Sequence, residues 1–204
     1  MNLEIKELRK KDFNKAIEFA INGMNFNKYL ENQFALKLYG RYFFYMEMER
    51  ATNIIAAYID DKLAGILMVD MKKQEKKYSS FWRKLYVKGF ESLMKLIIKD
   101  GPNTYDKANA VMLKDYLKKN SPSGEICFLA ADPKIKGKGI GTRLLNELKR
   151  LEQDKLVYLY TDSNCTYQFY EKKGFKRSEE KEIEMELGGK LVPLSCFLYS
   201  KQLI

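Results

Sequence analysis

Residues 124–142, GEICFLAADPKIKGKGIGT, decide the fold of this chain. The apolar residues from 126 to 131 predict a short strand, which ends at Asp132 and Pro133. A glycine-rich turn follows, and the apolar residues beyond it recur at helical spacing. These residues are Ile140, Leu144, Leu145, Leu148 and Leu151. The stretch therefore predicts a strand, a glycine turn and a helix in direct succession.

A glycine-rich turn at the start of a helix is a favourable place for an anion. Unpaired backbone N–H groups and the positive end of the helix dipole both lie there. Glycines at 137, 139 and 141 lack the Cβ atoms that would keep a phosphate away from the backbone. We therefore expect a phosphorylated ligand, and the alternative is that these glycines serve only tight packing of strand and helix. Basic side chains flank the turn: Lys134, Lys136, Lys138 and Arg143.

Two common phosphate-binding motifs do not fit this turn. A dinucleotide fingerprint requires G-x-G-x-x-G, whereas the turn has G-x-G-x-G. The ATP-type loop requires Gly-Lys-Ser/Thr at a fixed distance after its first glycine, and that sequence does not follow Gly137. The hexapeptide KGKGIG, residues 136–141, instead resembles the Q/R-x-x-G-x-G/A motif of the GNAT superfamily of N-acetyltransferases, with lysine in the first position.

This resemblance implies acetyl-CoA as the cosubstrate. In the family the backbone amides of the turn hold the pyrophosphate of acetyl-CoA, so the change of the first side chain is mild. By the same resemblance, main-chain groups of Leu129 and Ala131 pair with the pantetheine arm, and an N–H group there polarises the acetyl carbonyl. The turn residues assigned to the coenzyme are Lys136, Gly137, Lys138, Gly139, Ile140, Gly141 and Thr142.

A second stretch, residues 162–175 with the sequence DSNCTYQFYEKKGF, is similar to a later motif of the same family. In that motif an asparagine near a helix start precedes F-Y-E-K-x-G-F. Asn164 stands one residue closer to the tyrosine than is usual, so Ser163 and Asn164 are both candidates for contact with the coenzyme. The resemblance implies that Tyr170 is the acid that protonates the departing thiolate, and core packing is the alternative role.

The fold implied by the resemblance is a mixed α/β domain with a central, mixed, splayed sheet of about seven strands flanked by helices. The chain has β-rich runs in suitable places, including a hairpin upstream of the glycine turn and a closing pair after the second motif. These runs cover residues 3–8, 54–59, 63–71, 126–131, 156–161, 175–185 and 191–201.

Between residues 72 and 123 the chain departs from the common family pattern. About fifty residues stand where a short connection is more usual, and they are too apolar for a flexible loop. We expect a helical insertion that packs over one edge of the sheet as a helical hairpin and walls the acceptor pocket. An aromatic-rich helix predicted over residues 31–49 either lines part of that pocket or is buried on all sides.

Length and composition narrow the functional classes. The chain has 204 residues, of which 46% are hydrophobic and 13% aromatic, and this predicts one ordered domain over residues 1–204. It has no histidine, which excludes histidine-based triads, histidine metal sites and a histidine base. The net charge of +10 suggests nucleic-acid binding as an alternative function, but the lysines are spread along the chain rather than concentrated.

The cysteine pattern and the lack of long apolar runs predict a cytoplasmic protein. Cys127, Cys165 and Cys196 are far apart and form no C-x-x-C pair, so they fit neither a disulfide framework nor a zinc site. The N-terminus lacks the apolar core of a signal peptide, and no run of about eighteen apolar residues occurs. We expect no metal and no membrane or nucleic-acid partner, and a homodimer is left open.

Amine acetylation also requires a group that removes a proton from the amine. Without histidine this group is a carboxylate, a tyrosine or a water relay. Glu125, at the start of the predicted coenzyme strand, is the best single candidate. Two alternatives stay open: Glu125 is an exposed charge at a strand end, or the amine loses its proton to water before it reacts.

The function predicted from these features is direct transfer of the acetyl group of acetyl-CoA to a primary amine. The acceptor is a small molecule or a peptide that the sequence does not identify. The alternative is a non-catalytic member of the same fold that binds coenzyme A as a sensor or scaffold.

Overall fold

The computed structural model describes residues 2–28, 30, 32–97, 104–135, 137–187 and 190–204. Within them runs one seven-stranded sheet with the order β1-β2-β3-β4-β5-β7-β6. Only β4 and β5 are parallel, so the predicted mixed sheet is confirmed. The strands are β1 (Leu3–Lys6), β2 (Asn53–Ile59), β3 (Lys62–Met71), β4 (Gly124–Ala131), β5 (Leu156–Asp162), β6 (Lys176–Leu187) and β7 (Lys190–Gln202).

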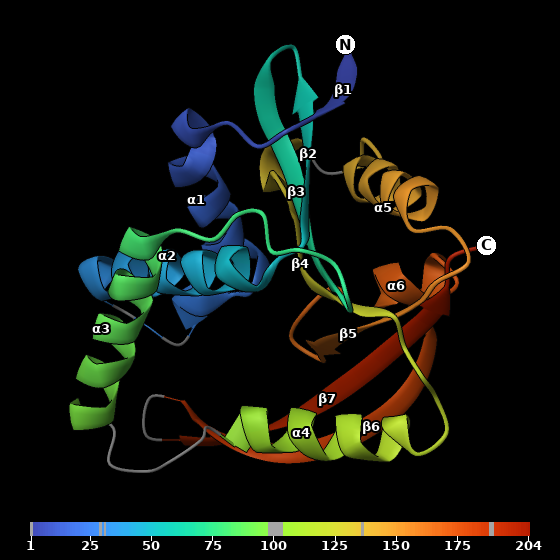
Figure 1. Cartoon of the computed structure of the whole chain (residues 1–204). Coiled ribbons are helices and arrows are strands. Elements are labelled where there is room, and N and C mark those ends of the chain that lie inside the picture. Colours follow the sequence, from blue (N-terminus) through green and yellow to red (C-terminus); the bar gives the residue numbers. More distant parts are fainter. Residues whose placement is uncertain (1, 29, 31, 98–103, 136, 188–189) are drawn as a thin grey trace.

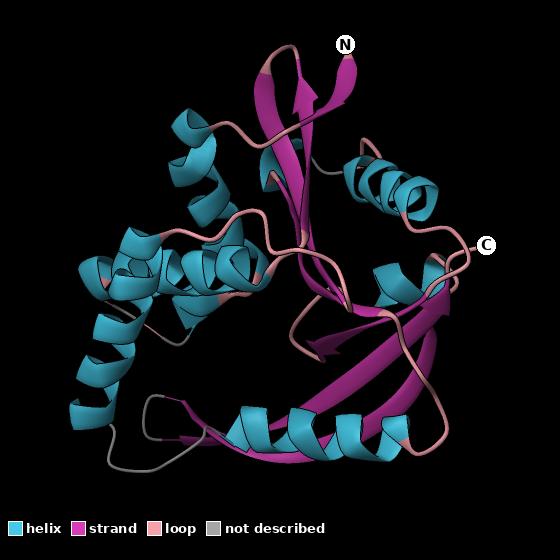
Figure 2. Ribbon diagram, viewed as in Figure 1, coloured by secondary structure: helices cyan, strands magenta, loops and turns pink. Residues whose placement is uncertain are grey.

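Helices cover both faces of this sheet (Figure 2). On the part of the sheet formed by β1 to β4, α1 and α2 pack on one face and α5 packs on the other. Helix α4 crosses β6 and β7 (Figure 1). The helices are α1 (Phe13–Gly23), α2 (Gln33–Arg50), α3 (Phe81–Ile97), α4 (Thr104–Leu117), α5 (Ile140–Leu151) and α6 (Gln168–Lys172).

The sheet splits between β4 and β5. These strands pair only at Gly124 with Val157 and at Glu125 with Tyr158. Beyond that point β4 stays with β3 as far as Ala131, whereas β5 stays with β7 as far as Asp162. The two halves of the sheet therefore separate from one another, as Figure 1 shows, and the predicted splay is confirmed.

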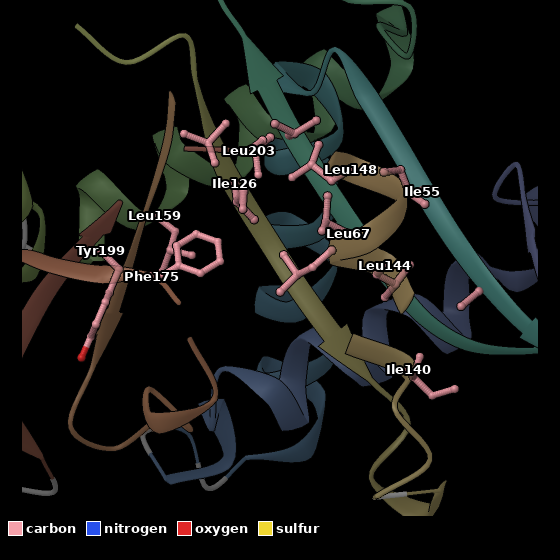
Figure 3. Close-up of a cluster of buried hydrophobic side chains, with 14 of the residues drawn as sticks. Ile55, Leu67, Ile126, Ile140, Leu144, Leu148, Leu159, Phe175, Tyr199 and Leu203 are labelled. Carbon is pink, nitrogen blue, oxygen red and sulfur yellow. The ribbon is translucent and has the colours of Figure 1, made fainter. Parts of the chain in front are cut away.

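The helix after the glycine turn is fixed by a continuous apolar stripe. Ile140, Leu144 and Leu148 of α5 are buried against Ile55 of β2 and Leu67 of β3 (Figure 3). Residues spaced by four or eight positions lie on one face of a helix, which is why the sequence pattern located this helix correctly. The packing holds the start of α5 beside the end of β4.

The aromatic-rich helix α2 lies between the sheet and α3. Phe44 is buried in the core beneath the sheet face. On the other side of α2, the ring of Tyr42 stacks on Phe90 of α3 at a centroid distance of 4.5 Å, and Tyr45 contacts Tyr86 edge-on at 5.5 Å. The sheet and α3 thus each contact aromatic residues of α2. These residues therefore occupy more than one face of the helix.

The predicted helical hairpin in the insertion is wrong. Of its two helices, α3 packs along α2, whereas α4 lies across β6 and β7 (Figure 1). The apolar stripe of each helix could be recognised in the sequence. The sequence did not indicate against which element each stripe packs. Long-range packing decides that choice, and no local pattern encodes it.

Polar residues that precede α1 and α6 do not cap these helices. Asp12 does precede α1, but its carboxylate binds Arg9 and the hydroxyl of Tyr58 rather than the helix amides. Neither Ser163 nor Asn164 caps α6, which begins at Gln168 without a side-chain cap.

Gly65 in β3 tests how tightly α5 is seated. A Cβ atom at this position would lie 2.5 Å from Cγ2 of Ile140 and 3.1 Å from the carbonyl oxygen of Ala130. Gly65→Ala should therefore lower the free energy of unfolding by about 1 to 3 kcal/mol, because a stiff side chain and a backbone atom must both move.

Gly89→Ala in α3 is the matched control, because an added Cβ atom there meets nothing within 4 Å. It should stabilise the helix by about 0.5 to 1 kcal/mol. Urea unfolding of both variants gives the comparison. Equal changes in the free energy of unfolding for the two substitutions would contradict the close packing of α5 against β3.

Candidate active site

The split leaves one edge of β4 without a strand partner among the described residues. The N–H group of Asp132 donates to the carbonyl oxygen of Ala64 at 2.8 Å, so it points toward β3. Hydrogen-bonding groups of successive residues in a strand point to opposite edges. The N–H groups of Ala131 and Leu129 therefore point away from β3, into the gap between β4 and β5.

The glycine turn lies at the end of the same strand. Gly137 and Gly139 have positive φ values of 86° and 72°, a region that residues with a side chain rarely adopt. Gly139 is the N-cap of α5, it makes no side-chain cap, and its carbonyl accepts the first helical bond from the N–H of Arg143 at 2.9 Å. Lys136 lies outside the described residues.

The N–H groups of Ile140, Gly141 and Thr142 begin α5 and so have no partner within the helix. Added Cβ atoms at 137 and 139 would meet nothing within 4 Å, so these two glycines are required by φ and not by protein packing. A Cβ atom at Gly141 would lie 2.9 Å from the ring of Phe169. The packing alternative thus applies to Gly141, whose missing side chain lets α5 contact α6.

Tyr170 lies on α6 within an aromatic cluster. Its ring centroid is 5.4 Å from that of Phe169, 5.6 Å from Phe175 and 6.3 Å from Tyr199. Burial raises the pKa of Tyr170, and the nearby thiol of Cys165 raises it further. No hydrogen bond joins its hydroxyl to another described residue. The phenol is therefore a neutral donor without a competing protein acceptor.

Asp162 organises the turn that leads to α6. Its side chain is only 6% exposed, and Oδ1 accepts the N–H groups of Asn164 at 2.8 Å and Cys165 at 3.2 Å. Oδ2 accepts the hydroxyl of Tyr105 from α4 at 3.3 Å. The insertion helix α4 thus helps to hold the turn in place.

The sequence analysis missed Asp162, although an aspartate directly after a strand is typical of such turns. Ser163, in contrast, extends the pairing of β5 with β7. Its N–H donates to the carbonyl of Ser195, and its hydroxyl accepts from the N–H of that residue. The carbonyl oxygen of Asn164 accepts the side-chain amide of Asn25 at 3.2 Å.

Glu125 is at the last paired position before the strands separate. Its Oε2 accepts the hydroxyl of Tyr158 at 3.0 Å and forms an ion pair with Nη2 of Arg50 at 2.5 Å. Its side chain is largely buried. The alternative that Glu125 is an exposed strand-end charge is therefore wrong.

A second buried carboxylate, Glu47 of α2, lies close to Glu125. It is 4% exposed, Nη1 of Arg50 lies 3.6 Å from its Oε2, and that oxygen has no hydrogen-bond partner among the described residues. Burial raises the pKa of Glu47 to about 8, although Arg50 opposes the shift. Burial likewise raises the pKa of the neighbouring Cys127. These groups form a polar cluster where the sheet splits.

The chain matches a known family over part of its length. Residues 105–177 match the family model described as an acetyltransferase (GNAT) domain. Over this stretch the chain is similar to a GNAT acetyltransferase domain. The match spans β4, the glycine turn, α5, β5 and α6, so both stretches noted in the sequence lie within it.

Solved structures share the GNAT fold over almost the whole chain. One structure, from Corynebacterium glutamicum, is described as histone acetyltransferase HPA2 and related acetyltransferase. It is 14% identical to this chain, with a TM-score of 0.60 over 97% of this chain and 96% of that chain. A PaiA N-acetyltransferase from Thermoplasma acidophilum, in complex with coenzyme A, is 16% identical, with a TM-score of 0.54 over 99% of each chain.

An N-acetyltransferase from Staphylococcus aureus Mu50 is 14% identical, with a TM-score of 0.53 over all of both chains. At such low identities the likeness shows the fold alone. No curated protein matches this chain in sequence. The GNAT fold is thus established for this chain, whereas its acceptor has to be argued from its own residues.

Two further observations concern metal ligands and membrane-spanning helices. In the part of the chain that the structure describes, no three histidine, cysteine, aspartate or glutamate side chains are grouped as metal ligands. Over the same residues, no helix combines the length and apolar character needed to cross a membrane.

The raised pKa of Glu47 predicts a dependence of stability on pH. Between its ordinary value of 4.5 and about 8, folded Glu47 holds a proton that the unfolded chain releases. The free energy of unfolding should therefore fall by up to about 5 kcal/mol as the pH rises through this window, and level off above it.

Glu47→Gln removes this titration and keeps the shape of the side chain. The variant should lose the fall and exceed the wild type in stability at pH 8, as urea unfolding from pH 5 to 9 would measure. Glu18→Gln, at an exposed position of α1, serves as the control and should change little. An unchanged pH slope in Glu47→Gln would show that Glu47 is not the titrating group.

Proposed function

We propose that this GNAT protein transfers the acetyl group of acetyl-CoA directly to a primary amine of a small molecule or peptide. One observation carries the proposal: the open edge of β4 and the glycine turn at the start of α5 follow one another along a single strand. An extended thioester arm and its pyrophosphate need these two features side by side.

The residues of the turn fit the phosphate end of the cosubstrate. The backbone N–H groups of Gly137, Gly139 and the first residues of α5, Ile140 to Thr142, supply donors at the positive end of a helix. Lys138 and Arg143 add positive charge beside them. The first motif residue, Lys136, belongs to the proposed site on the resemblance alone.

The edge of β4 fits the arm. The N–H groups of Leu129 and Ala131 point into the gap, where they can pair with the amides of pantetheine as an added strand would. Acetyl-CoA would supply an acetyl group activated as a thioester. An N–H group on this edge is suited to stabilise the negative charge that develops on the acetyl oxygen.

Glu125 is proposed as the group that accepts the proton of the amine. It lies where β4 and β5 part, and Arg50 and Tyr158 fix its carboxylate in orientation. Both partners are already in place before an amine arrives, so the carboxylate needs no reorganisation. Loss of the proton to water stays as the alternative route.

The aromatic face of α2 is proposed as the acceptor side. Burial raises the pKa of Tyr39 on α2, and the charge of Asp106 of α4 raises it further. Burial also raises the pKa of Tyr42 to about 12, with a contribution from Glu91. Aromatic rings bordered by carboxylates favour a cationic or amine ligand.

A screen of amine acceptors with a thiol-release assay tests the proposed reaction. Release of coenzyme A that depends on a primary amine, with the acetylated amine identified by mass spectrometry, is the expected result. Tight binding of acetyl-CoA without turnover on any amine would instead favour a sensor or scaffold.

Binding of acetyl-CoA at the turn is tested by adding a side chain at Gly139. Gly139→Val should abolish binding, since its Cβ atom would stand in the path of the phosphate. Gly139→Asn is the informative companion, because asparagine tolerates the φ of 72° and an added Cβ atom there meets no protein atom within 4 Å. Calorimetry should show binding more than about tenfold weaker in both variants. Unchanged affinity in a folded variant would remove the turn from the site.

Tyr170→Phe separates catalysis from packing. Phenylalanine keeps the contacts with the rings of Phe169, Phe175 and Tyr199 and removes only the donor. We expect kcat to fall by about tenfold to a thousandfold, the usual contribution of a general acid, while KM for acetyl-CoA changes little. Phe169→Leu tests the packing alone and should lower stability with a smaller effect on kcat. Full turnover by Tyr170→Phe would leave water to protonate the thiolate.

A further inference from the structure

The helix α3 is firmly seated on α2 through one of its faces. Phe90 stacks on Tyr42, and Nε of Arg83 forms an ion pair with Oε1 of Glu49 at 2.9 Å. The hydroxyl of Tyr86 donates to the carbonyl oxygen of Leu38 at 3.2 Å. These contacts fix the rotation of the helix about its axis, so its outer face is the one presented to solvent.

That outer face carries a second apolar stripe. Phe81 is 72% exposed, Trp82 75%, Leu85 53% and Leu93 50%. Trp82, Leu85, Gly89 and Leu93 are spaced by three and four residues, so they follow one line along the helix. Large apolar side chains gathered in this way on a seated helix indicate a surface that binds a partner. We call Phe81, Trp82, Leu85, Gly89 and Leu93 the α3 ridge.

Positive charge surrounds the α3 ridge. Lys84 and Lys88 are exposed beside the apolar residues, and a run of exposed lysines immediately precedes the helix. The one acidic residue between 81 and 94, Glu91, is turned toward Tyr42 of α2, whose pKa it helps to raise. Lys84 and Lys88 form no ion pair in the described structure.

We propose that the α3 ridge and its flanking lysines dock this protein on an anionic membrane surface. An amphipathic helix with tryptophan, phenylalanine and leucine on one line and lysines beside it lies in the plane of the lipid headgroups. The lysines attract acidic lipids, and the apolar side chains enter the boundary of the acyl chains. The inference is independent of the acetyl transfer proposed above.

The charge of the ridge decides between a membrane and a second copy of the chain. An isologous dimer through α3 would bring Lys84 and Lys88 against the same lysines of its partner, and like charges at close range oppose association. The apolar residues of the ridge are also interrupted by lysines, glycine and serine. A bilayer accepts each inserted side chain separately, whereas a protein partner needs a matching pocket for every one.

The dimensions suit a helix that lies on the membrane. From Phe81 to Leu93 the ridge extends over about 18 Å at 1.5 Å per residue, too short to span the hydrocarbon layer. The lack of a run of about eighteen apolar residues excludes a membrane-spanning helix of that kind, but not a helix that lies on the membrane surface.

Trp82 is the single tryptophan of the chain, so its fluorescence reports on the ridge directly. The experiment adds vesicles of phosphatidylcholine, with and without about one third of phosphatidylserine, to the full-length protein. We expect a blue shift of the emission and co-sedimentation only with the anionic vesicles, and loss of both as salt is raised. Quenching by brominated lipids should place Trp82 below the headgroups.

Three variants complete the test. Lys84→Gln with Lys88→Gln should weaken binding to anionic vesicles by roughly tenfold or more. Leu85→Ser with Leu93→Ser should do the same without changing the salt dependence. Leu191→Ser is the matched control, because Leu191 is 68% exposed elsewhere on the surface, and it should have no effect.

Three results would overturn the proposal. One is the absence of a spectral shift with either lipid. Another is a shift that grows with protein concentration in the absence of lipid, together with dimers in ultracentrifugation, which would identify a second copy as the occupant. The last is an equal response to polyglutamate, which would indicate an acidic protein.

Discussion

The pairing of β4 with β5 ends after Glu125, and the rest of the site depends on that early end. One cause is visible in β4 itself. Its register with β3 places Met68 opposite Phe128 and Val69 opposite Ile126, so Cys127 is an extra residue, a β-bulge. The bulge changes the alternation of side chains: Ile126 packs under α5, whereas Phe128 packs under α1 and α2. The strand thereby turns away from β5 and opens its edge.

The local features of this arrangement could be predicted from the sequence. The apolar spacing of α5, the glycine turn and the strand before it are all encoded within a few residues, and each was located correctly. The splay was also expected, but only from the family resemblance, since the sequence of β4 does not reveal that Cys127 is a bulge. Gly174, with a positive φ of 75°, follows the end of α6, a position that favours glycine.

What the sequence could not provide are the contacts made across long separations. Glu47 lies near Glu125 although the two are 78 positions apart in the sequence. Nothing in the MEMER segment of α2 indicates that its first glutamate is buried. Asp162 has a local signature, but its bond to Tyr105 depends on where α4 packs. The two insertion helices were predicted to pair with each other, and each found a different partner instead.

The polar cluster at the split is costly, and its cost argues for a role. Taking charges out of water lowers stability unless they are fully paired, and apolar residues of similar volume often do as well or better. Here one arginine, Arg50, stands among Glu47, Asp70 and Glu125, and an oxygen of Glu47 has no hydrogen-bond partner in the described structure. If stability were the only requirement, leucine and isoleucine, which fill the core elsewhere on the sheet, would serve better at these positions than the polar cluster. The cluster stands where the strands part and where the open edge of β4 begins.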